Sequence, residues 1–408
     1  MNALLDALRA VVGDAHVITT GDMAGWESDW RGRYRGRCLA VVRPGNTEEV
    51  AAVVRRCAAA SPPVGIVPQG GNTGLVGGGV PDTSGRQILL SLTRLDRVRA
   101  VDPDNLSMTV EAGCVLQVAQ ATAADAGLLF PLSLAAEGSC TVGGNLATNA
   151  GGTQVLRFGN ARSLCLGLEV VTPQGELWSS LSGLRKDNTG YDLRDLYIGS
   201  EGTLGVITAA TLSLFPRPRA VVTAWVALEG LSAAVTLLRR LRTAFDAALT
   251  AFEVLNRHSL DLVKMHFPAL REPLSLTAQA EWVVLLELAS PHDESWLMEQ
   301  VEIVLADALE TGEIVDASLA RSGPQAEALW QWREAVPLAQ AKDGLNIKHD
   351  IGVPVSAVPD FVAAADAALA VLLPGARHVT FGHLGDGNLH YNLQAKTAAS
   401  SSRATKPP

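Results

Sequence analysis

Three glycine-rich stretches in the first half of the chain place the strongest constraint on its fold. They read "PQGGNTGLVGGGVP" at 68–81, "PLSLAAEGSCTVGGNLATNAGG" at 131–152 and "RKDNTGYDLRDLYIGSEGTLGVIT" at 185–208. Glycine permits positive φ and lets backbone N–H groups approach a ligand closely, which suits a pyrophosphate. None of the stretches fits G-x-G-x-x-G or G-x-x-x-x-G-K-[ST]. They therefore either bind a nucleotide-like cofactor by another scheme or form surface loops that bind none.

The length and composition indicate a folded protein of two or three domains. Of 408 residues, 48% are hydrophobic and 18% are charged, which is typical of globular chains. The net charge of -9 disfavours a nucleic-acid binder, which would need a basic face. No run of about 18 uncharged apolar residues is found, so we expect no transmembrane segment. The N-terminus lacks the basic region that is typical of a signal peptide, so we do not expect one.

The five cysteines are odd in number and show no C-x-x-C spacing. This usage predicts free thiols in a reducing compartment, and we expect a cytoplasmic protein.

A change in the sequence pattern near residue 217, from glycine-rich stretches to alternating helix and strand patterns, predicts a domain boundary. The linker "LFPRPRA", at 214–220, has two prolines in three residues, which should stop regular structure. Before it, we predict a helix at 46–60 capped by Asn46 or Thr47, and another ending at Gly127. After it, we predict an α+β domain, an antiparallel sheet with helices on one face. Its expected strands lie at 221–228, 249–255, 281–288, 313–320 and 346–353, and its longer helices at 293–310 and 324–341.

The stretch "TFGHLGDGNLHYNL", at 380–393, carries two histidines, His383 and His390. A separation of seven would put them on opposite faces of one strand, but the intervening "LGDGN" is a turn signal. Placed on adjacent strands, both imidazoles could face one site and bind a divalent ion such as zinc. The alternative is that both are ordinary core or surface residues.

Two cations upstream, Arg333 and Lys348, stand out in an acidic chain. A planar guanidinium suits a carboxylate bidentately, although a helix-surface arginine is more often an ion-pair partner. Trp330 and Trp332 on the same predicted helix are interpreted as packing residues, and His349 as structural.

The motifs "GGNTGLVGG", "GSCTVGGNLATNAGG", "LRKDNTGYDL" and "GSEGTLGVIT" resemble the FAD-binding domain of the vanillyl-alcohol oxidase / p-cresol methylhydroxylase superfamily. The likeness runs from about Arg43 to Leu393 and is strongest to the D-2-hydroxy-acid dehydrogenases, in particular the D-2-hydroxyglutarate dehydrogenase branch. It implies an α+β chain with a two-subdomain PCMH-type FAD-binding domain at 1–217, a cap domain with an antiparallel sheet at 218–393, and a disordered tail at 394–408.

The same resemblance implies a set of cofactor-binding residues. The FAD pyrophosphate would be wrapped by the segment from Gly70 to Gly74, and Val206 or Ile207 would approach the adenine. Asn72 stands where relatives with covalent flavin often have a histidine, so the FAD is expected to be non-covalent. The full implied set is Gly70, Gly71, Asn72, Thr73, Gly74, Gly138, Ser139, Gly143, Gly144, Asn145, Thr148, Gly152, Val206, Ile207 and Asn388.

The activity that the resemblance implies is oxidation of a D-2-hydroxy acid, of the D-2-hydroxyglutarate or D-lactate type, by hydride transfer to flavin N5. Arg333 and Lys348 would hold the carboxylate and Asn392 would orient the substrate. His383 and His390 would hold a divalent metal, for which the resemblance implies zinc. Pro337 stands where some relatives carry a hydroxyl, so no single acid is singled out. A quinone, an electron-transfer flavoprotein or a cytochrome would accept the electrons, and a homodimer is compatible with the sequence.

One expected motif is absent. Relatives carry a later Glu-His-Gly segment whose glutamate completes the metal site and whose histidine is the candidate base, but no "EHG" occurs in this sequence. The tail "QAKTAASSSRATKPP" has no apolar periodicity. We therefore expect a chain truncated near Gln394. The alternative to an active dehydrogenase is a catalytically impaired flavin-binding subunit or interaction module.

Overall fold

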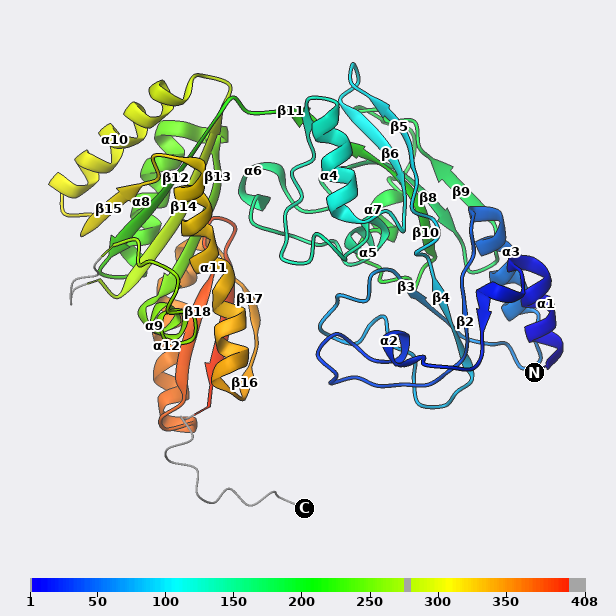
Figure 1. The fold of residues 1–408 in the computed structure, drawn as a ribbon. Coiled ribbons are helices and arrows are strands. Elements are labelled where there is room, and N and C mark those ends of the chain that lie inside the picture. The colour runs from blue at the N-terminus through cyan, green and yellow to red at the C-terminus, as the bar shows by residue number, and fades with distance from the viewer. Residues whose placement is uncertain (1, 275–279, 396–408) are drawn as a thin grey trace. The chain divides into compact units, whose positions relative to one another are not determined.

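The computed structural model describes residues 2–274 and 280–395, and their contacts divide the chain into two compact units (Figure 1). The first unit comprises the chain up to Gly152 together with Phe158–Arg217. The second comprises Thr153–Arg157 and the chain from Pro218 onward. The short segment 153–157 was not expected to group with the second unit.

In the described residues, the first unit contains two larger sheets and the two-stranded pair β7 and β11. Strands β1, β2, β4 and β3 form the first in that order, with β2, β4 and β3 parallel. The second is antiparallel, in the order β5-β6-β10-β8-β9. The strands are β1 (Val17–Ile18), β2 (Cys38–Val42), β3 (Ile66–Gln69), β4 (Gln87–Ser91), β5 (Val98–Asp102), β6 (Ser107–Glu111), β7 (Leu128–Leu129), β8 (Cys165–Val171), β9 (Leu177–Ser180), β10 (Val206–Ser213) and β11 (Phe215–Pro216).

The helices of this unit cover the sheets and connect their strands. They are α1 (Asn2–Val12), α2 (Ala24–Glu27), α3 (Thr47–Ala58), α4 (Leu116–Asp125), α5 (Val142–Ala147), α6 (Val155–Phe158, across the boundary of the units) and α7 (Arg194–Tyr197). Asn46 caps α3, because its side-chain oxygen accepts a hydrogen bond from the Glu49 N–H at 2.8 Å. The predicted cap is therefore confirmed as Asn46.

All five cysteines are free and buried, and burial raises the pKa of the Cys57 thiol to about 11.

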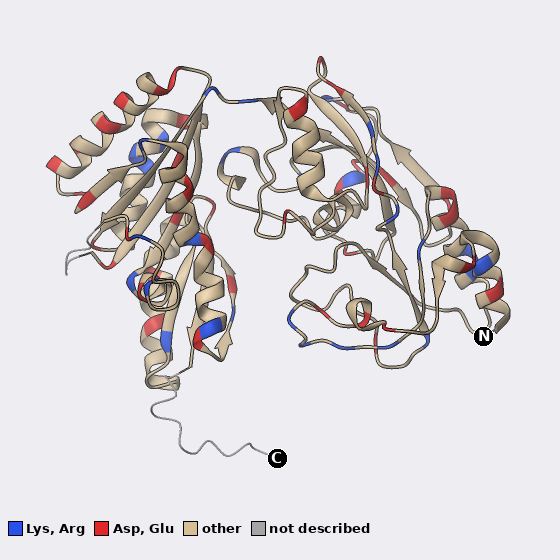
Figure 2. Ribbon diagram, viewed as in Figure 1, with Lys and Arg blue, Asp and Glu red and all other residues tan. Residues whose placement is uncertain are grey.

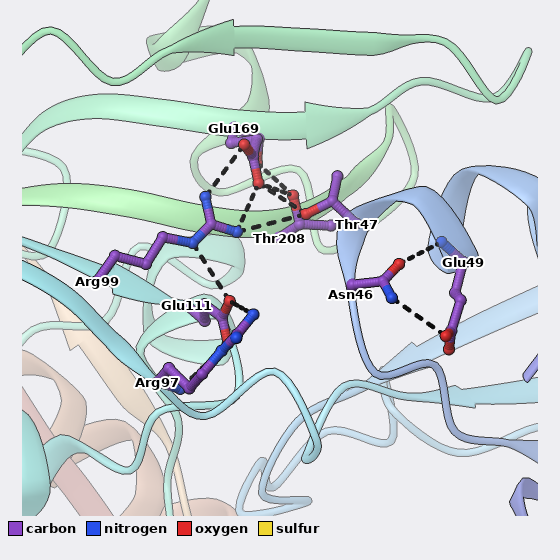
Figure 3. A network of polar contacts seen from close by, with 8 residues as sticks. All are labelled: Asn46, Thr47, Glu49, Arg97, Arg99, Glu111, Glu169 and Thr208. Atoms are coloured by element: carbon purple, nitrogen blue, oxygen red, sulfur yellow. Dashed lines mark hydrogen bonds and ion pairs between the residues drawn. The ribbon is translucent and has the colours of Figure 1, made fainter.

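A buried polar network joins α3 to the second sheet (Figure 3). The Glu169 carboxylate of β8 accepts hydrogen bonds from Thr47 at 2.8 Å, from Thr208 at 2.9 Å and from Arg99 at 3.1 Å. Burial alone would raise the pKa of Glu169, but these donors hold it below its ordinary value. Arg99 also contacts Glu111 of β6, so one guanidinium neutralises carboxylates from two strands. The network fixes the helix that precedes the first glycine-rich stretch.

The second unit is built on one antiparallel eight-stranded sheet. Its path is β15-β12-β14-β13-β18-β19-β16, and β17 also pairs with β19. The strands are β12 (Ala220–Leu228), β13 (Leu249–Asn256), β14 (Trp282–Ser290), β15 (Asp316–Leu319), β16 (Asn346–Ile347), β17 (Asp350–Gly352), β18 (Arg377–His383) and β19 (Asn388–Gln394). The helices are α8 (Leu231–Phe245), α9 (Arg257–His266), α10 (Glu294–Glu310), α11 (Gly323–Asp343) and α12 (Val358–Leu372).

Helices cover both faces of this sheet, so the expectation of helices on one face is wrong. One hydrophobic cluster joins the sheet to α8, α10 and α12, and another joins it to α9 and α11. Consecutive residues of β12 contribute to opposite clusters: Ala224 and Val226 to the first, Trp225 to the second. The central strands are near-continuous apolar runs rather than alternating ones, which is the sequence signal of a sheet buried on both faces.

Three further expectations are corrected. The linker at 214–220 is partly regular, because Phe215–Pro216 form β11 and pair with β7. The disordered tail was expected to begin at Gln394, but this residue belongs to the fold. Gln394 ends β19, is buried, and its side-chain amide donates to the Gln340 carbonyl at 3.2 Å. Residues 396–408 of that expected tail lie outside the described residues. The expected strand at 346–353 is two short strands, β16 and β17.

One helix in the described part of the chain is long and apolar enough to span a membrane, judged by length and composition alone. It covers Val355–Leu372, with a mean hydropathy of 1.7 and 11% of it buried. Asp360 and Asp366 interrupt this segment, so it is not an uncharged run in the sequence. The expected absence of such a segment is therefore not confirmed.

Candidate active site

The three glycine-rich stretches meet within the first unit. A Cβ added to Gly71 would lie 1.9 Å from the Ser139 carbonyl oxygen, and one added to Gly70 would lie 2.3 Å from Thr141 Oγ1. The first two stretches thus touch in a way that only glycine allows. The third is joined to the second by a hydrogen bond from the Glu201 N–H to the Ala147 carbonyl at 2.9 Å. These contacts bring the three stretches together, and the arrangement fits the cradle that a dinucleotide needs.

Several predicted cofactor residues have partners within the protein. The Asn72 side-chain amide, at a residue with φ 52, donates to the carbonyls of Gly25 at 3.0 Å and Ser28 at 2.8 Å. Asn145 is buried and contacts Cys140 Sγ, and the Thr148 hydroxyl donates to the Gly144 carbonyl at 3.0 Å. These hydrogen bonds hold the loops in shape.

The remaining predicted cofactor residues differ in how exposed they are to solvent. Gly74 has no atom within 4 Å of an added Cβ, and Gly138 and Ser139 are exposed. Val206 and Ile207 are buried in β10. The set that lies in the glycine-rich loops is Gly70, Gly71, Asn72, Thr73, Gly74, Gly138, Ser139, Gly143, Gly144, Asn145, Thr148 and Gly152. Asn388, by contrast, belongs to the second unit, where it begins β19.

The predicted histidine pair comes together in the second unit. His383 ends β18 and His390 lies on β19, the neighbouring antiparallel strand, after the turn at 384–387. Their ring centroids are 5.3 Å apart, and the Phe381 ring lies 4.8 Å from that of His390. The prediction that a turn places the two histidines on adjacent strands is confirmed.

A buried glutamate that sequence reasoning missed organises this pair. Glu253 of β13 is fully buried, and its carboxylate accepts from Arg333 Nε at 2.7 Å and from His383 Nδ1 at 2.5 Å. Burial would raise the pKa of Glu253, but the charges of His383 and Arg333 lower it to about 2. The available signal was a single acid within the apolar strand "LTAFEVL".

Asp350 of β17 is a second missed carboxylate. His390 Nδ1 lies 2.5 Å from Asp350 Oδ1. Burial would lower the pKa of both histidines, and it does lower that of His390, whereas the Glu253 carboxylate raises the pKa of His383 above its ordinary value. Because an ionised carboxylate only accepts, each Nδ1 must donate, and each neutral ring then keeps its lone pair on Nε2.

Arg333 is placed so that part of its guanidinium remains available. Nε is bound to Glu253, and the guanidinium carbon lies 4.7 Å over the Phe381 ring. Within residues 2–274 and 280–395, its terminal nitrogens make no hydrogen bond. These two nitrogens can donate parallel hydrogen bonds to the two oxygens of one carboxylate. Arg333 is itself buried, which would strengthen such a contact.

The other predicted residues lie on elements next to this group. Lys348 lies between β16 and β17, close enough to Asp350 to help lower its pKa. Asn392 is buried; its oxygen accepts from the His349 N–H at 3.0 Å and its amide donates to Gln340 at 3.0 Å. Asn392 therefore ties the Lys348 segment to α11, the helix that carries Arg333. Pro337 lies within α11 and has no N–H to donate to the Arg333 carbonyl.

Two protein-family descriptions match most of the chain. Residues 38–180 match the FAD binding domain, and residues 217–406 match the C-terminal domain of FAD linked oxidases. The second match runs past Gln394, where the sequence likeness was expected to stop.

Comparison with individual proteins also finds relatives that match nearly the whole chain. The chain is 37% identical over 401 residues to the mitochondrial D-2-hydroxyglutarate dehydrogenase of Bos taurus, covering 97% of this chain and 71% of the bovine protein. Among solved structures, alkyldihydroxyacetonephosphate synthase matches with a TM-score of 0.75 at 17% identity, over 98% of this chain and 82% of that one. A substrate-bound p-cresol methylhydroxylase matches with a TM-score of 0.70 at 17% identity, over 97% and 82%. At such identities the structural matches show the fold alone.

Proposed function

Because this chain belongs to the family of FAD-dependent D-2-hydroxyglutarate dehydrogenases, we propose that it oxidises a D-2-hydroxy acid to the 2-oxo acid. The C2 hydride would pass to flavin N5 and the hydroxyl proton to solvent. The observation that carries the proposal is the group formed by Arg333, Glu253, His383 and His390. It combines a carboxylate-binding fork with two oriented imidazoles on adjoining strands. A small hydroxy acid needs both recognition of its carboxylate and help in losing its hydroxyl proton.

Bound FAD would supply the two-electron acceptor of this reaction, and the glycine-rich loops of the first unit fit its pyrophosphate. The terminal nitrogens of Arg333 would bind the substrate carboxylate, with Lys348 adding a second positive charge. Glu253 fixes the guanidinium in place, so little rotational freedom is lost on binding. Holding a reactant in this manner can contribute up to about 7–11 kcal/mol to lowering a barrier.

We also propose that His383 and His390 hold a divalent metal, for which zinc is our candidate. Metal-bound histidines usually donate their other ring nitrogen to a carboxylate, and here Nδ1 of each does so, to Glu253 and Asp350 respectively. Among the described residues, no group of three His, Cys, Asp or Glu side chains is placed to hold a metal. The two Nε2 atoms would therefore share the ion with oxygen ligands. Such an ion lowers the pKa of a bound hydroxyl.

The test of the proposed activity is anaerobic bleaching of the flavin. The purified holoprotein should be reduced by D-2-hydroxyglutarate or D-lactate and not by the matching L-acid, because the carboxylate fork and the imidazole pair fix the orientation of C2. Glycolate, which has no stereocentre, serves as the third substrate. A yellow protein that none of the acids bleaches would contradict the proposal and favour a flavin-binding subunit without turnover.

The metal proposal is tested by metal analysis of His390→Gln. We expect about one zinc per wild-type chain and a loss of metal affinity of at least about 10-fold in the variant, since half of the protein ligands is removed. His292→Gln is the matched control, because His292 is exposed and lies outside the group. Equal metal content in all three proteins would exclude the imidazole pair as the metal site.

A further inference from the structure

A cavity in the second unit has no role in the reaction proposed above. It has a volume of about 530 Å³, which lies within the usual range for small-molecule sites. Strands β12 and β14, the first residue of α10 and the first half of α11 form its walls. The lining residues are Val221, Thr223, Glu287, Glu294, Ala320, Ser322, Gly323, Ala326, Glu327, Trp330, Gln331 and Glu334.

A buried hydroxyl in this cavity lacks a partner. Thr223 is 1% exposed, and its Oγ1 has no hydrogen bond to any residue of the described ranges 2–274 and 280–395. An unsatisfied buried polar group costs about 1–3 kcal/mol, so a group that could pair with it from within the cavity would be stabilising. Thr223 is directly opposite Glu287 in the register of β12 and β14. The unpaired hydroxyl therefore lies beside a carboxyl.

Glu287 is the second polar group of the cavity floor. One carboxyl oxygen accepts from the Trp330 indole N–H at 3.0 Å and the other from the Thr250 hydroxyl at 3.1 Å. Burial raises the pKa of this carboxyl, and no Lys or Arg is among the lining residues. A half-buried carboxyl without a positive partner is disfavoured in its ionised form, and a cationic ligand would supply that partner.

The remaining lining residues combine acidic and apolar groups. Glu294, Glu327 and Glu334 add three carboxyl groups, and α10, which begins at Glu294, contains no Lys or Arg (Figure 2). Val221, Ala320 and Ala326 provide apolar surface, and Trp330 an aromatic ring. We propose that this cavity binds a small organic amine with at least two ammonium groups joined by methylene chains. Ammonium groups would pair with the carboxylates and the Thr223 hydroxyl, and the methylenes would contact the apolar surface and Trp330.

A simple metal ion fits this cavity less well than an amine. In the described part of the chain, no three His, Cys, Asp or Glu side chains come close enough to ligate one ion. The spaced carboxyl groups instead match charges that are separated along a flexible molecule. The cavity and the Glu253 group share α11, because Trp330 precedes Arg333 by three residues. The proposal of an amine site does not rest on the proposed catalytic function.

The test is calorimetric titration of the holoprotein with spermidine at low ionic strength. We expect one saturable site whose affinity falls at least about tenfold in Glu287→Gln, since a half-buried charge partner of the amine is lost. Glu310→Gln is the matched control: it makes the same change at an exposed residue of α10 outside the cavity. An equal loss of affinity in the control would mean general attraction to an acidic protein and would overturn the proposal. The absence of saturable binding to the wild type would overturn it as well.

Thr223→Val gives an independent readout. Valine has a similar shape and no hydroxyl, so without the amine the variant should melt at a higher temperature than the wild type. It should nevertheless bind spermidine more weakly, because the amine loses one hydrogen-bonding partner. A variant that binds spermidine as tightly as the wild type would contradict the assignment of Thr223 to the site. Displacement of spermidine by an equal concentration of Mg²⁺ would count against an amine-specific site.

Discussion

Glu253→Gln is expected to lower kcat/KM for the hydroxy acid by at least about 100-fold and to destabilise the second unit. The Glu253 carboxylate accepts from Arg333 and His383 at the same time, one on each oxygen. A glutamine retains one acceptor and turns an N–H₂ toward the other donor, leaving a buried cation without its counter-charge. Breaking a buried ion pair in this way typically costs about 3–5 kcal/mol. Flavin reduction kinetics and thermal melting measure the two effects.

The same substitution should change the acid stability of the protein. The pKa of Glu253 is about 2 in the folded protein, below its ordinary value of 4.5. A depressed folded-state pKa stabilises the fold above the unfolded-state pKa, and this contribution is lost as the pH falls from about 4.5 towards 2. Glu253→Gln should therefore remove part of the pH dependence of stability in that window. A variant with wild-type turnover and an unchanged melting temperature would show that Glu253 does not organise the site.

Arg333→Met is expected to lower kcat/KM by about 30-fold to several thousand-fold, the range that corresponds to truncating one partner of a buried charge pair. The substrate carboxylate would lose the two guanidinium nitrogens that bind it, and Glu253 would keep only His383 as a hydrogen-bonding partner. Most of the loss should appear in KM if the arginine binds the ground state and transition state equally. Steady-state kinetics with D-2-hydroxyglutarate separates these outcomes.

Arg333→Lys and Arg321→Met are the comparison variants. A lysine keeps the charge but cannot bind Glu253 through one nitrogen while offering two others in a planar fork, so it should restore little activity. Arg321 is an exposed arginine paired with Glu302 at the surface, and replacing it tests the loss of a positive charge alone. Full activity of Arg333→Lys would contradict the bidentate role.

The histidine pair and the glycine-rich loops could be predicted from sequence because their signals are local. His383 and His390 flank a turn, and the strands on either side follow from that turn. The Asn46 cap is likewise adjacent to the helix that it begins. The two histidines and the cap lie within about one element of the residues that they contact. Each glycine-rich stretch is recognisable from its own sequence, although the contacts between the stretches join residues far apart in the chain.

Glu253 and Asp350 could not be predicted in the same way, because their partners lie far along the chain. Glu253 contacts His383 130 residues away, and Asp350 contacts His390 40 residues away. Their pairing depends on the strand order, which places β13 beside β18 and β17 beside β19. A lone acid in an apolar strand gives no indication of which distant donor it meets. The helices on both sheet faces were missed because fully apolar strands were interpreted as facing one layer.

The most direct test of the central claim is rapid-mixing measurement of anaerobic flavin reduction by D-2-hydroxyglutarate carrying deuterium at C2. If Arg333 and the imidazole pair position the acid for hydride transfer, the deuterated acid should reduce the flavin more slowly than the unlabelled one. Arg333→Met should require a much higher acid concentration and still show that isotope effect. A flavin reduced at the same rate by both acids would show that C2 hydride transfer is not the measured step. A flavin that neither acid reduces would contradict the assignment of this chain to hydroxy-acid oxidation.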